Sequence, residues 1–227
     1  MRATPSNSLT SPLRWALITV FLCGMAAGLV FGGPLDRPAL MAMPCTAFAV
    51  VGAVVTQCRP RNPIGWVFLS VGTLAGLLGI ARACMHQALV DGMPTPWYGV
   101  LGAWLNTWGW FPLVTLATVF TVLLFPNGLL SARWRPLLWI TTVSTLAMTS
   151  IIACAPVLNM GNGENPITLH NPLNPGWSVQ TGDFFAGIAG FILLLCTIVA
   201  LFTATKRFAP SQSNVRVPSP SKLPFRY

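Results

Sequence analysis

The chain is strongly apolar and basic. Of its 227 residues, 54% are hydrophobic and only 7% are charged, and the net charge is +9. An ordinary soluble domain carries roughly 25% charged residues, so this composition excludes a soluble globular protein. No basic segment with interleaved aromatic residues forms a continuous patch, which argues against nucleic-acid binding. We therefore expect an integral membrane protein whose main partner is the lipid bilayer.

Six apolar stretches are each long enough to cross a membrane. A helix of about 20 apolar residues spans a hydrocarbon core of roughly 30 Å and satisfies its own backbone hydrogen bonds there. The stretches cover residues 15–33, 40–56, 64–82, 104–125, 137–157 and 184–204. They predict an all-α polytopic membrane protein, with a six-helix bundle over residues 15–205, an N-terminal segment (1–14) and a C-terminal tail (206–227).

Glycines recur at helical spacing in the first and third stretches. The first stretch exceeds the roughly 7–15-residue core of a signal peptide, so we expect it to be retained as a helix. Gly24, Gly28 and Gly32 lie on one face of it, and Gly72 and Gly76 lie on one face of the third stretch. Small residues let helix backbones approach closely, either within this bundle or across a homodimer interface.

The turn before the third stretch, RPRNPIGW, combines charge with helix-start residues. Asn62 is placed to cap the third helix, and Pro63 suits its first turn, where a missing N–H costs nothing. Arg59 and Arg61 are expected to anchor this turn on the cytoplasmic side.

The fourth stretch holds the polar residues that bear on transport. They are Asn106, Thr115, Thr118 and Thr121. Hydrogen bonds to neighbouring helices explain them, whereas a hydrated cavity lined by them would favour a small transport component that binds a neutral solute. Pro112 in this stretch and Pro44 in the second are expected to kink their helices.

One long loop, residues 158–183, separates the last two stretches. It is rich in Asn, Pro and Gly, which favours turns over helix. Loops of this length are uncommon without a role, so the loop is either a structured cap or a surface for an extracytoplasmic ligand or partner. The candidate residues for such a surface are Asn165, His170, Asn171, Asn174 and Trp177.

The basic residues predict the orientation in the membrane. With six spans both termini lie on one side, and short loops rich in Lys and Arg stay in the cytoplasm. Only Arg37 and Arg82 fall on the other side. The cytoplasmic set is Arg2, Arg14, Arg59, Arg61, Arg133, Arg135, Lys206, Arg207, Arg216, Lys222 and Arg226. We expect a multi-pass protein of a bacterial plasma membrane with both termini in the cytoplasm.

The residues needed for catalysis or cofactor binding are missing from the predicted spans. These spans contain no Asp, Glu, Lys or His, so acid–base catalysis and proton-coupled transport are disfavoured. Both histidines, His86 and His170, are expected outside the helices, with no repeated ligand spacing. Cys84 and Cys154 are the one cysteine pair near the outer side, where a disulfide is conceivable. We expect no enzyme activity, no cofactor and no metal.

Three motifs carry a family resemblance. They are RPRNPIGWVFLSVGTLAGLL (59–78), VLLFPNGLLSARWRPLLWI (122–140) and NPLNPGW (171–177). In order and spacing they resemble the N-terminal multi-pass membrane regions of actinobacterial sensor histidine kinases. Asn127 stands where that family usually has an acid, and Leu129 where it usually has an arginine. The resemblance implies a signal-receiving membrane region.

The tail departs from such kinases. KRFAPSQSNVRVPSPSKLPFRY contains no histidine or acid, and its composition favours disorder. We expect no kinase activity in this polypeptide. The remaining interpretations are a stand-alone or truncated sensor that acts on a separate signalling protein, a small transport component, and a degenerate product without independent function.

Overall fold

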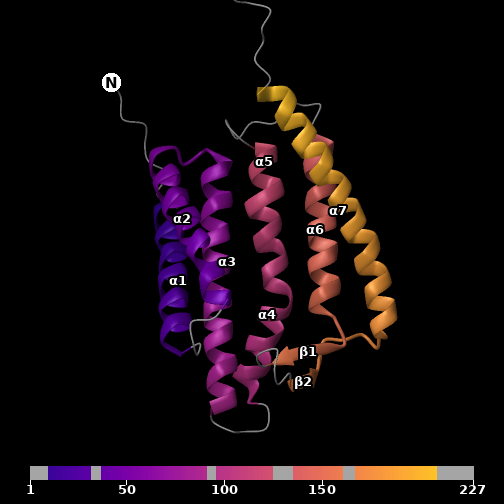
Figure 1. Ribbon diagram of the computed structural model, residues 1–227. Coiled ribbons are helices and arrows are strands. Elements are labelled where there is room, and N and C mark those ends of the chain that lie inside the picture. Colours follow the sequence, from indigo (N-terminus) through magenta and orange to yellow (C-terminus); the bar gives the residue numbers. More distant parts are fainter. Residues whose placement is uncertain (1–9, 32–36, 91–95, 125–134, 161–166, 209–227) are drawn as a thin grey trace, which may run out of the picture.

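The computed structural model describes residues 10–31, 37–90, 96–124, 135–160 and 167–208. In these residues the chain runs up and down through long helices, with a small hairpin at one end of the bundle (Figure 1). The helices are α1 (Thr10–Phe31), α2 (Arg37–Cys58), α3 (Pro63–Val90), α4 (Trp97–Thr115), the π-helix η1 (Leu116–Phe120), α5 (Thr121–Leu124), α6 (Arg135–Ala153) and α7 (Val179–Phe208). The hairpin strands are β1 (Val157–Met160) and β2 (Ile167–His170). We call its end of the bundle the hairpin end, and the opposite end the arginine end.

Five helices in the described part of the chain are long and apolar enough to cross a membrane. They cover Ser11–Phe31, Pro63–Val90, Trp97–Leu124, Arg135–Ala153 and Val179–Phe202. The expected class, a mostly helical polytopic membrane protein, agrees with this finding. The predicted second span, residues 40–56, coincides with α2, of which Pro44–Cys58 counts as a shorter apolar helix.

Several helices extend beyond the predicted spans. Helix α3 continues to Val90, where the prediction ended at residue 82, and α4 begins at Trp97, seven residues before the predicted start. With 28 residues α3 is about 42 Å long at 1.5 Å per residue, which exceeds a hydrocarbon core of roughly 30 Å. Hydropathy marks where lipid contact ends, but a helix continues until a residue breaks it. As a result, His86 lies within α3, and the prediction that it lies outside the helices was wrong.

Helix α3 is the centre of the N-terminal half of the bundle, and small residues bring its neighbours close. A methyl group added at Gly24 of α1 would overlap the carbonyl group of Gly76 of α3. One added at Gly72 would lie 2.5 Å from the Cβ atom of Ala49 in α2. Gly24, Gly28, Gly72 and Gly76 therefore pack within this bundle, and Gly32 lies outside the described residues.

Helix α4 passes through a π-helical turn into α5, and the three form one rod (Figure 1). Pro112 lies inside α4, and the π-helical turn begins four residues later at Leu116. Proline has no N–H for the helical ladder, and a wider turn is one way to restore the pairing of backbone groups. Pro44 likewise lies inside α2 without ending it.

The predicted long loop contains two strands that the sequence reasoning did not anticipate. β1 and β2 pair antiparallel, with Leu158 opposite Leu169 and Met160 opposite Ile167. Leu158 and Met160 are 0% and 3% exposed, because they pack against Met85 of α3 and its neighbours. Alternate residues of a strand share a face, so this hairpin turns its apolar side onto the ends of α3 and α4. The loop is thus a structured cap.

Candidate functional site

The turn between α2 and α3 has the geometry of a capped helix start. Asn62 Oδ1 accepts a hydrogen bond from the Ile64 N–H (3.1 Å), and Pro63 is the first residue of α3. Trp66 Nε1 donates to the carbonyl oxygen of Pro60 (2.8 Å) and ties the turn to the helix. Arg59 and Arg61 are exposed, as expected of residues that anchor a turn at the headgroups.

Of the other residues predicted to anchor the bundle, the one whose side chain is described lies at the same end. Arg135 is the first residue of α6, at the arginine end, and is exposed. Arg133 lies outside the described residues, and so do the side chains of Lys206 and Arg207, although α7 continues to Phe208.

At the hairpin end, Asn171 ties three segments together. Its Nδ2 atom donates to the carbonyl oxygens of Ala153 (2.9 Å) and Ala155 (2.7 Å), and its Oδ1 atom accepts from the Leu173 N–H (3.0 Å). The side chain is 0% exposed. Carbonyl groups at a helix C-terminus have no partner within the helix, and Asn171 supplies one for α6. Its polar atoms therefore serve the fold and do not face a ligand.

Trp104 reaches the same helix end from α4. Its Nε1 atom donates to the carbonyl oxygen of Ala153 (2.9 Å), so this oxygen accepts from two side chains. The hairpin, α4 and the C-terminus of α6 are thereby joined by directional bonds as well as by apolar packing.

Asn174 shapes the turn that leads into α7. Its Oδ1 atom accepts from the N–H groups of Gly176 (2.6 Å) and Trp177 (2.7 Å), and Gly176 has the positive φ of 85° that glycine adopts readily. The ring of Trp177 lies 5.8 Å from that of Phe185 in α7, centroid to centroid. Residues 171–177, NPLNPGW, therefore form a connector whose turn is held by hydrogen bonds within it.

The two remaining candidates for the loop surface, His170 and Asn165, are not part of this connector. His170 is exposed at the end of β2, opposite Val157. Asn165 lies outside the described residues. Of the five candidates, the structure places Asn171, Asn174 and Trp177 in the connection between β2 and α7 and leaves His170 at its edge.

The polar residues of the fourth predicted span differ in exposure, and its threonines bond along their own helix. Thr115 and Thr118 donate to carbonyl oxygens four residues earlier in their own helix, those of Phe111 (2.9 Å) and Val114 (2.7 Å). Asn106 and Thr118 are exposed, whereas Thr115 is buried. Thr115 and Thr118 thus bond along their own helix, where hydrogen bonds to neighbouring helices were expected.

The sequence reasoning missed the polar face of α6. All of the buried residues of this helix carry hydroxyl groups, and they are Thr141, Ser144 and Thr145. Thr149 Oγ1 in the same helix and Trp108 Nε1 in α4 are buried polar atoms without a hydrogen-bond partner. The repeated Ser and Thr residues between positions 141 and 149 were the available signal.

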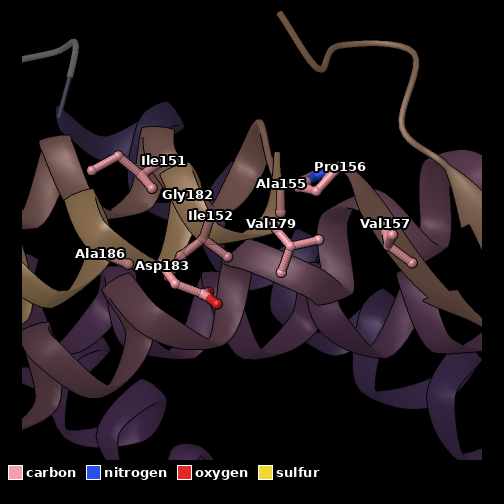
Figure 2. A pocket seen from close by; sticks show the side chains of 9 residues that line it. All are labelled: Ile151, Ile152, Ala155, Pro156, Val157, Val179, Gly182, Asp183 and Ala186. Atoms are coloured by element: carbon pink, nitrogen blue, oxygen red, sulfur yellow. The ribbon is translucent and has the colours of Figure 1, made fainter. Parts of the chain in front are cut away.

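A pocket of about 260 Å³ opens between the last turn of α6 and the first turns of α7 (Figure 2). Its lining consists of Ile151, Ile152, Ala155, Pro156, Val157, Val179, Gly182, Asp183 and Ala186. Asp183 is the one ionisable side chain among them. The pocket was not predicted from the sequence, because its lining comes from two segments, 151–157 and 179–186, that only the fold brings together.

Within the described residues, no group of three or more His, Cys, Asp and Glu side chains is arranged to hold a metal ion. Cys84 and Cys154 are free thiols. Comparison with protein-family models, with curated proteins and with solved structures found no match to this chain.

Proposed function

We propose that this chain is a signal-receiving membrane module without catalytic activity. It sits in the plasma membrane of a bacterium with six spans, both termini in the cytoplasm and the hairpin end outside. It passes a signal from the hairpin end through α6 and α7 to a separate signalling protein. In class it resembles the membrane region of a sensor histidine kinase.

The observation that carries the proposal is the fixed connection between the cap and the helix ends. Asn171 joins the cap to the C-terminus of α6, and the self-bonded turn at Asn174 leads from the cap into α7. A displacement of the cap would act on both helices at once. Such a direct connection favours signal reception over passive shielding, because a loosely attached loop would move without moving a helix.

The sixth span and the orientation are part of the proposal. Helix α2 has 22 residues, which is enough to cross a core of roughly 30 Å. The exposed cations Arg59, Arg61 and Arg135 gather at one end of the bundle, and Asp183 lies at the other. The positive-inside rule then puts the arginine end in the cytoplasm.

The arrangement of the polar residues speaks against transport. A solute pathway needs polar groups that converge, but Asn106 and Thr118 are exposed while Thr115 bonds to its own helix. The motifs that suggested the family form local structure, since NPIGW belongs to the capped turn and NPLNPGW forms the connector to α7.

A chimera tests the proposal. Residues 1–208 are fused to the dimerisation and catalytic domains of a histidine kinase whose output is read by a reporter gene. Asn171→Ala, which loosens the cap from α6, should change the reporter output per molecule in the membrane. His170→Ala, an exposed change beside it, should leave the output unchanged. If both variants leave it at the wild-type level, the cap does not control α7 and the proposal fails.

A further inference from the structure

The start of α7 stands away from α6, and this divergence creates the pocket. Among the described side chains of α7, the buried ones are Ala189, Leu193, Cys196 and Ala200, all in its middle and second half. Between Val179 and Ile188 no residue is buried. A side chain added at Gly182 would meet nothing within 4 Å. The space between the two helices at the hairpin end is therefore open to a ligand.

The lining of this space combines an apolar wall with a single negative charge. Seven of the nine lining residues are aliphatic or proline, and Asp183 lies beside Ile152 and Val179 (Figure 2). Among the described residues no cation lies within ion-pair distance of the Asp183 carboxylate, in a chain whose net charge is +9. An unpaired carboxylate at the edge of an apolar pocket attracts a cation and repels a phosphate group.

We propose that this pocket binds a small organic cation with an apolar body, such as a substituted quaternary ammonium ion. The apolar part would fill the space between Ile152 and Val179, and the charge would lie against Asp183. The pocket is slightly smaller than the roughly 300–1,000 Å³ of ordinary small-molecule sites, which fits a compact ligand or one end of a longer one. That this cation is also the signal rests on the proposed function, whereas its binding does not.

The test measures binding of benzyltrimethylammonium to the full chain in nanodiscs of zwitterionic lipid, with empty nanodiscs subtracted. We expect saturable binding that weakens as salt is added, because the ion pair is close to solvent. Asp183→Asn keeps the shape of the side chain and removes its charge, and it should weaken binding at least fivefold. Wild-type chain that binds no more than empty nanodiscs would overturn the proposal.

Two leucine variants separate the pocket from general effects on the helix. Gly182 and Gly187 both lie in α7 with nothing within 4 Å of an added Cβ atom, but only Gly182 lines the pocket. Gly182→Leu should abolish binding, and Gly187→Leu should bind as the wild type does. Equal binding by the two variants contradicts the site.

A neutral probe and the chimera complete the design. Neopentylbenzene has the shape of the probe without its charge, and it should not compete; if it competes equally, the space is only an apolar groove. Loss of binding in Gly182→Leu together with an unchanged chimera output for Asn171→Ala would sustain the site and reject the signalling role. Wild-type binding by Gly182→Leu together with a changed chimera output for Asn171→Ala would reject the site and leave the signalling role intact.

Discussion

At the scale of single residues, Asn171 shows how a polar side chain is accommodated in a mostly apolar protein. It is fully buried and makes three hydrogen bonds, all with backbone groups. Most hydroxyl groups of the membrane helices do the same over a shorter range, as Thr141 does with the carbonyl oxygen of Leu137 (2.8 Å). Buried polar groups without a partner are costly, so backbone carbonyl oxygens act as the common acceptors.

Removal of the Asn171 side chain should destabilise the protein strongly. Asn171→Ala leaves the Leu173 N–H and the carbonyl oxygen of Ala155 without this partner, and we expect a loss of about 3 kcal/mol in the free energy of unfolding. Unfolding in mixed detergent micelles with increasing SDS measures it. His170→Ala is the matched control and should change it by less than about 0.5 kcal/mol. Equal effects would mean that the cap is not held by Asn171.

Two tryptophans on successive turns of α4 should respond oppositely to the same change. Trp104 donates to Ala153, whereas the Nε1 atom of Trp108 is buried without a partner. Trp104→Phe should cost about 1 kcal/mol of stability, and Trp108→Phe should cost nothing or stabilise, because it removes an unsatisfied donor. The same SDS titration decides between them. A larger loss for Trp108→Phe would show that its N–H has a partner, such as a buried water molecule.

The number of residues between a side chain and its hydrogen-bond partner explains which structural roles could be predicted from the sequence. Asn62 was recognisable as a helix cap because its partner, the Ile64 N–H, is two residues away. Asn171 was taken for a ligand candidate because its partners, Ala153 and Ala155, are 18 and 16 residues away. An asparagine in a loop has the same appearance in both roles until the fold brings the distant carbonyl groups to it.

At the scale of elements, the close packing of α1 on α3 depends on glycine. Gly24→Ala would push a methyl group into the carbonyl group of Gly76, so the helices must separate along their length. We expect a loss of at least about 2 kcal/mol in stability, comparable to other overpacked contacts.

Gly190 in α7 provides the control for this change. It is also helical, but an added methyl group meets nothing within 4 Å, so Gly190→Ala should be neutral or stabilise by up to about 1 kcal/mol through helix propensity. Thermal unfolding in detergent measures both variants. If Gly24→Ala were as stable as Gly190→Ala, α1 would not pack on α3 as the structure has it.

The helices were easier to predict than their ends or the hairpin. Runs of apolar residues follow from the thickness of the bilayer, so each of the described helices overlaps a predicted span. Their ends depend on local contacts beyond the membrane, as the extension of α3 to Val90 under Met160 shows. The strands are four residues long and were hidden among turn-forming residues, since their pairing partner is not local.

At the scale of the whole molecule, the exposed arginines and the hairpin lie at opposite ends of the bundle. The exposed arginines of the described chain, Arg59, Arg61 and Arg135, lie at the arginine end, and we propose from the positive-inside rule that this end is cytoplasmic. The hairpin and its connector lie at the other end (Figure 1), and the pocket opens there between α6 and α7. In the function that we propose, the hairpin end receives a signal and α6 and α7 connect it to the opposite end.

The sidedness of three positions tests this account most directly. Ser11 lies at the start of α1, Cys58 at the end of α2 and Ser178 before α7, and all three are exposed. Single-cysteine chains carrying Ser11→Cys, the native Cys58 or Ser178→Cys are treated in cells with a membrane-impermeant maleimide. We expect labelling of Ser178→Cys in intact cells, and of the other two only after permeabilisation. Labelling of Ser11→Cys from outside would contradict the six spans, and labelling of Cys58 and Ser178→Cys from one side would contradict the bundle itself.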